Sequence, residues 1–125
     1  MATVPKVPLP IHEIENVLAF DQEKIIKAGQ TETLGTLDTS RFDKIRVVAV
    51  NEASTCDVHI RLTIMEPEGG KVEERIASLD EFTLKPHNQL TRIYDVPATK
   101  LEVSMVGLGR PGTQAEVEVL IYGQY

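Results

Sequence analysis

The chain has 125 residues, of which 42% are hydrophobic and 26% are charged. This composition is typical of one soluble globular domain and excludes an intrinsically disordered chain. The net charge of −6 excludes nucleic acid as an expected partner, because phosphate binding needs a basic field and the basic residues here are spread along the chain.

The single cysteine cannot form an internal disulfide, so we expect packing alone to stabilise the fold. No stretch approaches the roughly 18 apolar residues of a membrane-spanning helix, and the first ten residues lack the apolar run of a secretory signal. We therefore expect no membrane association and a cytoplasmic location for the sequence as written. Export by another route stays open.

Residues 1–10 contain Pro5, Pro8 and Pro10, which predict an extended proline-rich arm. We expect residues 11–125 to form one domain. The bare PxxP pattern of the arm is weak, so packing or a flexible role is favoured over recognition by a partner module.

Residues 11–28, IHEIENVLAFDQEKIIKA, allow two interpretations. The spacing of Ile11, Ile14 and Val17 fits a helix, whereas NVLAF and KIIKA on either side of a charged turn fit two short strands. The β character of everything that follows favours the strands.

From residue 31 onward, β-branched and alternating segments are separated by turn signals such as PEGG and KPHN. Strands are predicted at 31–39, 43–51, 55–66, 71–78, 81–84, 90–96, 100–107 and 114–123. The turn-rich LGRPGT predicts that the last two form a hairpin. Short strands at this spacing predict an all-β fold, a single antiparallel β-sandwich of about eight strands with a jelly-roll-like arrangement.

The order LDTSRFDKIRVVAVN, a long alternating strand, YDVPATKLEVSMVG and a final VLIYG resembles small bacterial jelly-roll sandwiches of the galactose-binding-like kind. The resemblance covers about residues 31–123 and consists of strands and turns. It implies a module that binds carbohydrate or joins proteins together. It carries over no site residue.

The segment TCDVHIRLTIME suggests chemistry, because the only cysteine stands three residues before a histidine. Side chains alternate across a strand, so Cys56 belongs to an apolar core face while His59 points to the other side. The two are therefore not expected to share a metal or to act as nucleophile and base.

Asp57, His59 and Arg61 share the outer face of the same predicted strand. One interpretation is a solvated polar face, and the other is a strip that hydrogen-bonds a sugar or a carboxylate. His12 and His87 lack ligand spacing, so no metal and no cofactor is predicted. The run Gly107, Gly109, Gly112 has dinucleotide-motif spacing, but a strand follows it and a hairpin loop is predicted instead.

Two predicted strands are apolar on both faces, which is unusual for a free sandwich. The outward residues Val48, Val50, Leu120 and Tyr122 predict a covered patch, which Met65 extends. The cover is the arm, the 11–28 segment or another subunit.

Two functions follow from these patterns. The first is a non-catalytic structural or interaction module that forms a homo-oligomer or docks to a larger assembly. The second is a module that binds carbohydrate or another small ligand through the strip or through loops 66–71, 85–89 and 107–113. The chain has no tryptophan for a sugar platform, so the first function is favoured. An enzyme is not expected, since no local acid–base or nucleophile motif is present.

Overall fold

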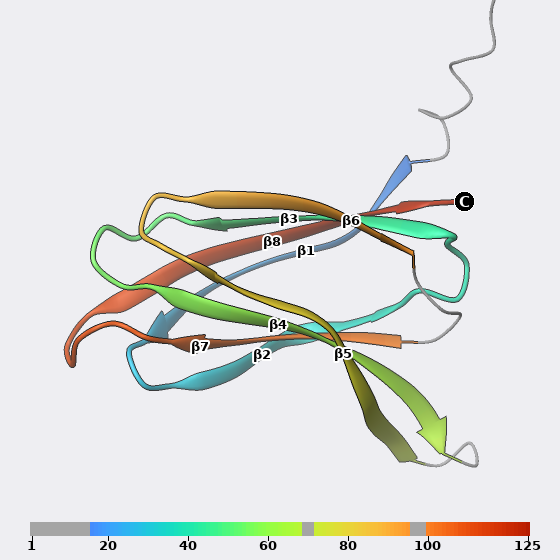
Figure 1. Ribbon diagram of the computed structural model, residues 1–125, viewed down its shortest axis with the longest axis horizontal. Coiled ribbons are helices and arrows are strands. Elements are labelled where there is room, and N and C mark those ends of the chain that lie inside the picture. The colour runs from blue at the N-terminus through green and yellow to red at the C-terminus, as the bar shows by residue number, and fades with distance from the viewer. Residues whose placement is uncertain (1–15, 69–71, 96–99) are drawn as a thin grey trace, which may run out of the picture.

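In the computed structural model, residues 16–68, 72–95 and 100–125 are described, and they form eight strands (Figure 1). The strands are β1 (Asn16–Lys27), β2 (Thr31–Asp38), β3 (Lys44–Asn51), β4 (Val58–Glu68), β5 (Val72–Leu84), β6 (Gln89–Asp95), β7 (Lys100–Gly107) and β8 (Gln114–Gln124). The predicted all-β class is confirmed. Within the described ranges, no helix is long and apolar enough to cross a membrane. The predicted arm, residues 1–10, lies outside these ranges.

The strands form two four-stranded antiparallel sheets that face each other (Figure 1). The β8 sheet has the order β1-β8-β3-β6, and the β7 sheet has the order β2-β7-β4-β5. Every consecutive pair of strands except β4 and β5 lies in different sheets, and the pairings β1–β8, β2–β7, β3–β6 and β4–β5 nest inside one another. This winding confirms the predicted jelly-roll sandwich.

The core lies between the sheets and follows the period of two along each strand. Along β8 the inward side chains are buried, while the residues between them are half-buried or exposed. The fully buried large side chains come mainly from the inner strands of both sheets: Ile45, Val47, Val58, Ile60, Leu62, Leu101, Val103, Met105, Val117, Val119 and Ile121. Removal of this apolar surface from water is the main force that holds the sheets together.

The 11–28 segment is neither a helix nor two strands over its described part. Residues 16–27 form the single strand β1, with a bulge between Leu18 and Phe20. The charged stretch Asp21 to Lys24 is tolerated inside the strand because β1 is an edge strand, where polar side chains reach water. Residues 11–15 lie outside the described ranges.

The predicted strands 71–78 and 81–84 are one strand, β5. The pairing of β5 with β4 shifts register twice, between Leu62 and Thr63 and between Ile64 and Met65. These bulges let β5 continue as one strand through the break that the sequence suggests. Met65, which was predicted to extend the outward patch, is only 7% exposed, and Thr63 is 6% exposed.

The predicted C-terminal hairpin is wrong. β7 pairs with β2 and β4, whereas β8 pairs with β1 and β3 in the other sheet. The loop between them crosses the roughly 10 Å that separate packed sheets, and the Leu108 amide donates a hydrogen bond to the Asp57 carbonyl at 2.9 Å. Glycine and proline mark a turn, but they do not determine whether the flanking strands pair with each other. The prediction that a strand follows Gly112 is confirmed.

Gly123, near the end of β8, leaves space for the buried ring of Phe42. A Cβ atom on Gly123 would overlap that ring, which is 4% exposed and packs at 5.4 Å centroid distance from Tyr125. The Phe42 ring and the hydrogen bond from the Asp43 amide to the Gln124 carbonyl at 2.8 Å therefore hold the loop between β2 and β3 against β8.

We expect Gly123→Ala to lower the free energy of unfolding by about 1–3 kcal/mol, because the added methyl overpacks the site. Urea denaturation measures the loss. In a Phe42→Leu background the same change should cost less, since the smaller side chain leaves room for the methyl. Equal costs in both backgrounds would contradict this contact as the cause.

Candidate functional site

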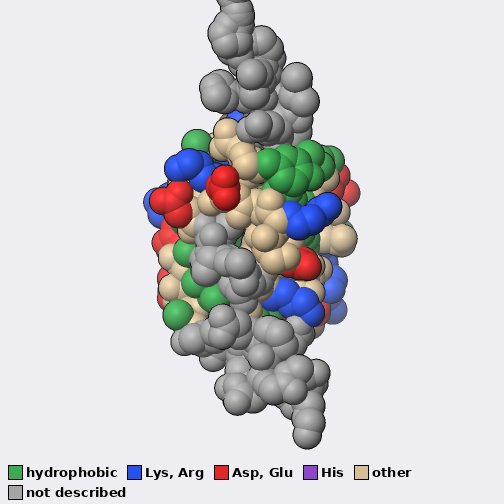
Figure 2. Space-filling model, turned by 90° about the vertical axis from the view of Figure 1, so that its right-hand side faces the viewer, with side chains coloured by type: hydrophobic (Ala, Val, Ile, Leu, Met, Phe, Trp, Pro, Cys, Tyr) green, Lys and Arg blue, Asp and Glu red, His purple; other side chains and the backbone are tan. Residues whose placement is uncertain are grey.

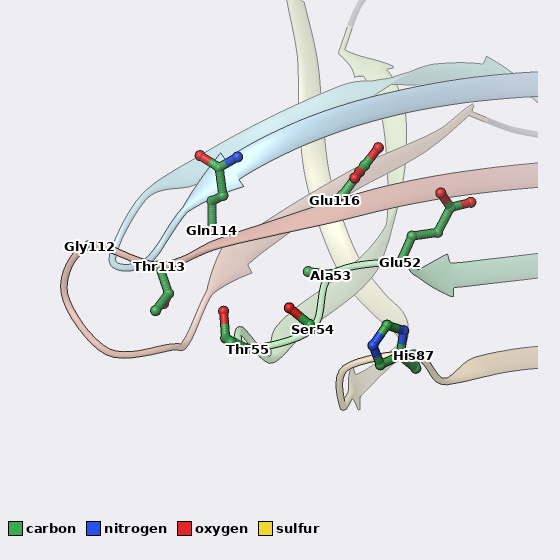
Figure 3. Close-up of a pocket in the computed structure, with 9 residues that line it drawn as sticks. All are labelled: Glu52, Ala53, Ser54, Thr55, His87, Gly112, Thr113, Gln114 and Glu116. Atoms are coloured by element: carbon green, nitrogen blue, oxygen red, sulfur yellow. The ribbon is translucent and has the colours of Figure 1, made fainter.

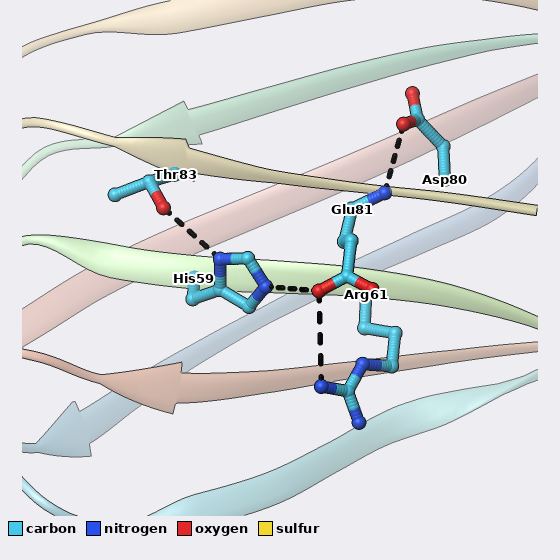
Figure 4. A network of polar contacts seen from close by, with 5 residues as sticks. All are labelled: His59, Arg61, Asp80, Glu81 and Thr83. Carbon is cyan, nitrogen blue, oxygen red and sulfur yellow. Dashed lines mark hydrogen bonds and ion pairs between the residues drawn. The ribbon is translucent and has the colours of Figure 1, made fainter. Parts of the chain in front are cut away.

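The predicted strip on β4 forms a cross-strand network with β5 (Figure 4). His59 lies opposite Thr83, and Arg61 lies opposite Glu81. His59 Nδ1 is 3.0 Å from Thr83 Oγ1, and His59 Nε2 is 2.7 Å from Glu81 Oε1. The Arg61 guanidinium is 3.8 Å from the same Glu81 oxygen. Both ring nitrogens of His59 thus have partners within the sheet.

The Glu81 carboxylate is the centre of this network. The hydrogen bond from His59 and the charge of Arg61 hold the pKa of Glu81 below its usual range. The side chain of His59 is 25% exposed. His59 and Arg61 of β4 thus find their polar partners in Thr83 and Glu81 of β5. This geometry gives the two strip residues a role in holding β4 to β5.

Asp57 and Cys56 lie just before β4 and do not join the network. The Asp57 carbonyl accepts hydrogen bonds from the Leu108 amide at 2.9 Å and from the Cys56 thiol at 3.4 Å. Cys56 is fully buried, so the predicted separation of Cys56 from His59 is confirmed. The buried Asn51 amide fixes this segment by donating to the carbonyls of Cys56 at 2.8 Å and Leu84 at 3.3 Å.

Asp80, next to Glu81, contacts the opposite sheet. Its Oδ2 accepts hydrogen bonds from the Tyr94 hydroxyl at 2.6 Å and from Arg92 Nη1 at 2.8 Å, both on β6. The Tyr94 hydroxyl and Arg92 hold the pKa of Asp80 below its usual range, whereas burial and the Asp80 charge raise the pKa of Tyr94. We call Asp80, Arg92 and Tyr94 the edge clamp, because they connect the edge strands of the two sheets.

Sequence reasoning missed the edge clamp. Its members lie up to 14 residues apart in the chain and meet only because β5 and β6 face each other across the sandwich. The neighbouring carboxylates are Asp80, which contacts Arg92 of β6, and Glu81, which contacts His59 of β4.

A hollow of about 490 Å³ opens at the end of the sandwich where β7 ends and β8 begins (Figure 3). Its lining is mainly polar and contains no Phe, Tyr or Trp: Glu52, Ala53, Ser54, Thr55, His87, Gly112, Thr113, Gln114 and Glu116. Loops 85–89 and 107–113 thus meet, as the ligand-binding hypothesis requires. β4 starts at this end and runs away from it, so residues 66–68 of the third predicted loop lie at the opposite end. Residues 69–71 lie outside the described ranges, and within those ranges no three His, Cys, Asp or Glu side chains are grouped to hold a metal ion.

One cross-strand row on the outer face of the β8 sheet has an exposed apolar side chain at each end. Leu18, Tyr122, Arg46 and Ile93 lie side by side on β1, β8, β3 and β6. Leu18 is 50% exposed and Ile93 is 64% exposed. The Arg46 guanidinium lies 4.8 Å from the Tyr122 ring centroid. Figure 2 views the end of the sandwich where β8 finishes, and hydrophobic side chains lie there among charged ones.

The predicted interface residues share this outer face and are all half-buried: Val48, Val50, Leu120 and Tyr122. Val48 lies directly opposite Leu120. Residues 16–27 do not cover the face, because they form its edge strand β1. Met65 does not extend the patch either, since it belongs to the other sheet.

Acidic side chains gather further along the same face. Glu118 of β8 is opposite Glu23 of β1, and Asp21 of β1 is opposite Leu120. Partial burial, followed by the charges of Asp21 and Glu23, raises the pKa of Glu118 above its usual value.

No protein-family model matches the chain, and no curated protein matches it in sequence. Among solved structures, a chain from deformed wing virus carrying the GFP gene matches 96% of this chain with 11% identity and a TM-score of 0.57. This chain covers 47% of that viral chain. The crystal structure of PirA matches 82% of this chain and 92% of its own with 7% identity and a TM-score of 0.49. A Clostridium thermocellum endo-1,4-beta-D-xylanase 10B structure with CBM22-1 and GH10 modules matches 86% of this chain and 27% of its own, with 7% identity and a TM-score of 0.47.

The strand order and the viral match define the class: the chain is a jelly-roll β-sandwich domain. At 11% identity the match shows the fold alone. The narrower resemblance to galactose-binding-like modules stays a prediction.

We expect Tyr94→Phe to lower the free energy of unfolding by about 1.5–3 kcal/mol at neutral pH, because Asp80 loses a charge-assisted hydrogen bond. The folded-state pKa of Asp80 is lowered, so this contribution is present above the unfolded pKa and is lost as the pH falls through the folded pKa. The difference between the two proteins should therefore shrink below about pH 4. Urea denaturation across pH measures it. Tyr125→Phe is the control, and a loss of equal size there would contradict the role of the clamp.

Proposed function

We propose that this protein is a non-catalytic structural module that binds a second copy of itself through the outer face of the β8 sheet. One observation carries the proposal: Leu18 and Ile93 are 50% and 64% exposed at the two ends of one cross-strand row. An exposed apolar patch on a folded domain is typical of an interaction site. Tyr122 and Arg46 lie between Leu18 and Ile93 in this row, and the half-buried Leu120 and Val48 form the centre of the next row.

The face has the dimensions of a weak interface. Four strands about 4.8 Å apart and about 26 Å long cover roughly 500 Å² per copy. A contact of about 1,000 Å² in total lies at the low end of specific protein interfaces. Association should therefore be reversible and depend on protein concentration.

A non-catalytic role agrees with the state of the reactive side chains. Cys56 is fully buried, and both ring nitrogens of His59 are hydrogen-bonded within the sheet. A nucleophile needs access to substrate, and a general base needs a free lone pair aimed at it.

Sedimentation velocity and light scattering over a concentration series test the proposal. The wild type should dimerise, and Leu120→Asp should weaken association at least tenfold by placing a charge in the apolar centre. Val106→Asp is the matched control, because Val106 is also half-buried and lies on the outer face of the β7 sheet. A wild-type monomer at all concentrations contradicts the proposal, as does equal weakening by both variants.

A second candidate function rests on the polar hollow of about 490 Å³. Its loops are close enough to bind one small ligand, and the carboxylates of Glu52 and Glu116 suit the hydroxyl groups of a saccharide. A glycan array with the wild type should then give hits that Glu116→Gln abolishes. The variant Glu81→Gln, on the outer face of the β7 sheet, should retain them. An array without hits contradicts saccharide binding.

A further inference from the structure

On the two inner strands of the β8 sheet, β8 and β3, positive and negative side chains lie at opposite ends of the outer face. The inner strands β8 and β3 define successive rows on this face through the pairs Lys44–Gln124, Arg46–Tyr122, Val48–Leu120 and Val50–Glu118. The next row contains Glu52, whose amide donates to the Glu116 carbonyl at 2.7 Å. The apolar Val48–Leu120 row is the middle of the five.

The cationic end is formed by Lys44 and Arg46. Lys44 forms an ion pair with Asp95 of β6 at 2.9 Å. Among the described residues, Arg46 contacts the Tyr122 ring and forms no ion pair. Its guanidinium is exposed and has donors available for a carboxylate.

The acidic end is formed by Glu118, Glu116 and Glu52, with Glu23 beside Glu118 on β1. Burial and like charges raise the pKa of Glu118. A cation placed there would relieve this repulsion.

The two ends cannot neutralise each other within one chain. Arg46 lies opposite Tyr122, four residues along β8 from Glu118. Four residues of a strand span about 13 Å, which is far beyond the reach of an ion pair. Arg46 and Glu118 therefore do not pair with each other within one copy.

We infer that two copies pack these faces together with their strands running in opposite directions, so that Arg46 of each copy faces Glu118 of the other. The inference rests on the proposed self-association and specifies its geometry. A two-fold axis that lies in the plane of the face, passes between Val48 and Leu120 and is perpendicular to the line from Arg46 to Glu118 produces this arrangement.

The symmetry puts the apolar centre on the axis and the opposite charges on both sides of it. In a two-fold interface each contact occurs twice. Arg46 then lies over Glu118, and Lys44 lies over the row of Glu116 and Glu52. A copy with its strands in the same direction would place the acidic ends against each other, and like charges in an interface are unfavourable.

Charge reversal with mixing tests the arrangement by sedimentation velocity. Arg46→Glu alone and Glu118→Arg alone should each weaken self-association at least tenfold, because each creates two like-charge contacts. An equimolar mixture should recover association to within about threefold of the wild type, since both contacts are then matched. The double variant Arg46→Glu/Glu118→Arg should also self-associate. Arg61→Glu, on the other sheet, should have no effect.

The outcomes separate the geometry from the proposed function. A monomeric wild type overturns both. A dimeric wild type whose single charge variants still associate, or whose mixture does not recover, overturns the arrangement and leaves self-association intact. Association that survives both charge variants and disappears when residues 1–15 are deleted assigns the contact to that segment and also overturns the arrangement.

Thermal unfolding of each variant shows whether it is folded. If Glu118→Arg is not folded, the pair Lys44→Glu and Glu116→Lys replaces the original pair, because the same axis places these residues over each other. The same recovery on mixing is expected. Its absence in this second pair overturns the arrangement.

Discussion

The register of β8 between β1 and β3 is the constraint on which the rest of the structure depends. One set of alternate side chains, Ala115, Val117, Val119 and Ile121, is completely buried between the sheets. The other set carries the charges and apolar side chains of the outer face. Because side chains alternate with a period of two, one register determines both surfaces, and a slip of one residue would exchange them. The core and the proposed interface are therefore two consequences of the same hydrogen-bonded pairing.

A two-sheet sandwich also has two open edges, and each is connected by polar side chains from both sheets. At one edge Lys24 of β1 forms an ion pair with Glu32 of β2 at 3.2 Å. Both side chains are largely exposed, so this pair contributes little. At the other edge, Asp80 accepts hydrogen bonds from Arg92 and Tyr94 in a less exposed setting. The second edge is thus the more firmly closed, and it lies beside the His59–Glu81 network that joins β4 to β5.

The period of two made the sandwich and the opposite directions of Cys56 and His59 predictable from sequence. It also placed Val48 and Leu120 on one outer face. Pairing partners were not predictable, because a glycine–proline loop looks the same in a hairpin and in a crossing between sheets; the expected β7–β8 hairpin failed for this reason. The bulges in β5 interrupt the alternation of side chains, so its sequence was interpreted as two strands. The edge clamp depends on a tertiary contact that no local sequence pattern encodes.

The two outer faces of the sandwich differ in how their charges are balanced. On the β7 sheet, opposite charges are neighbours: Glu81 contacts both His59 and Arg61 across two adjacent strands. On the inner strands of the β8 sheet, Glu116 and Glu118 are separated from Arg46 by the apolar Val48–Leu120 row. On the β7 sheet, these charged side chains therefore find opposite charges within the same chain. The proposed pairing of the second face with a reversed copy depends on this separation of charge along β8 and β3.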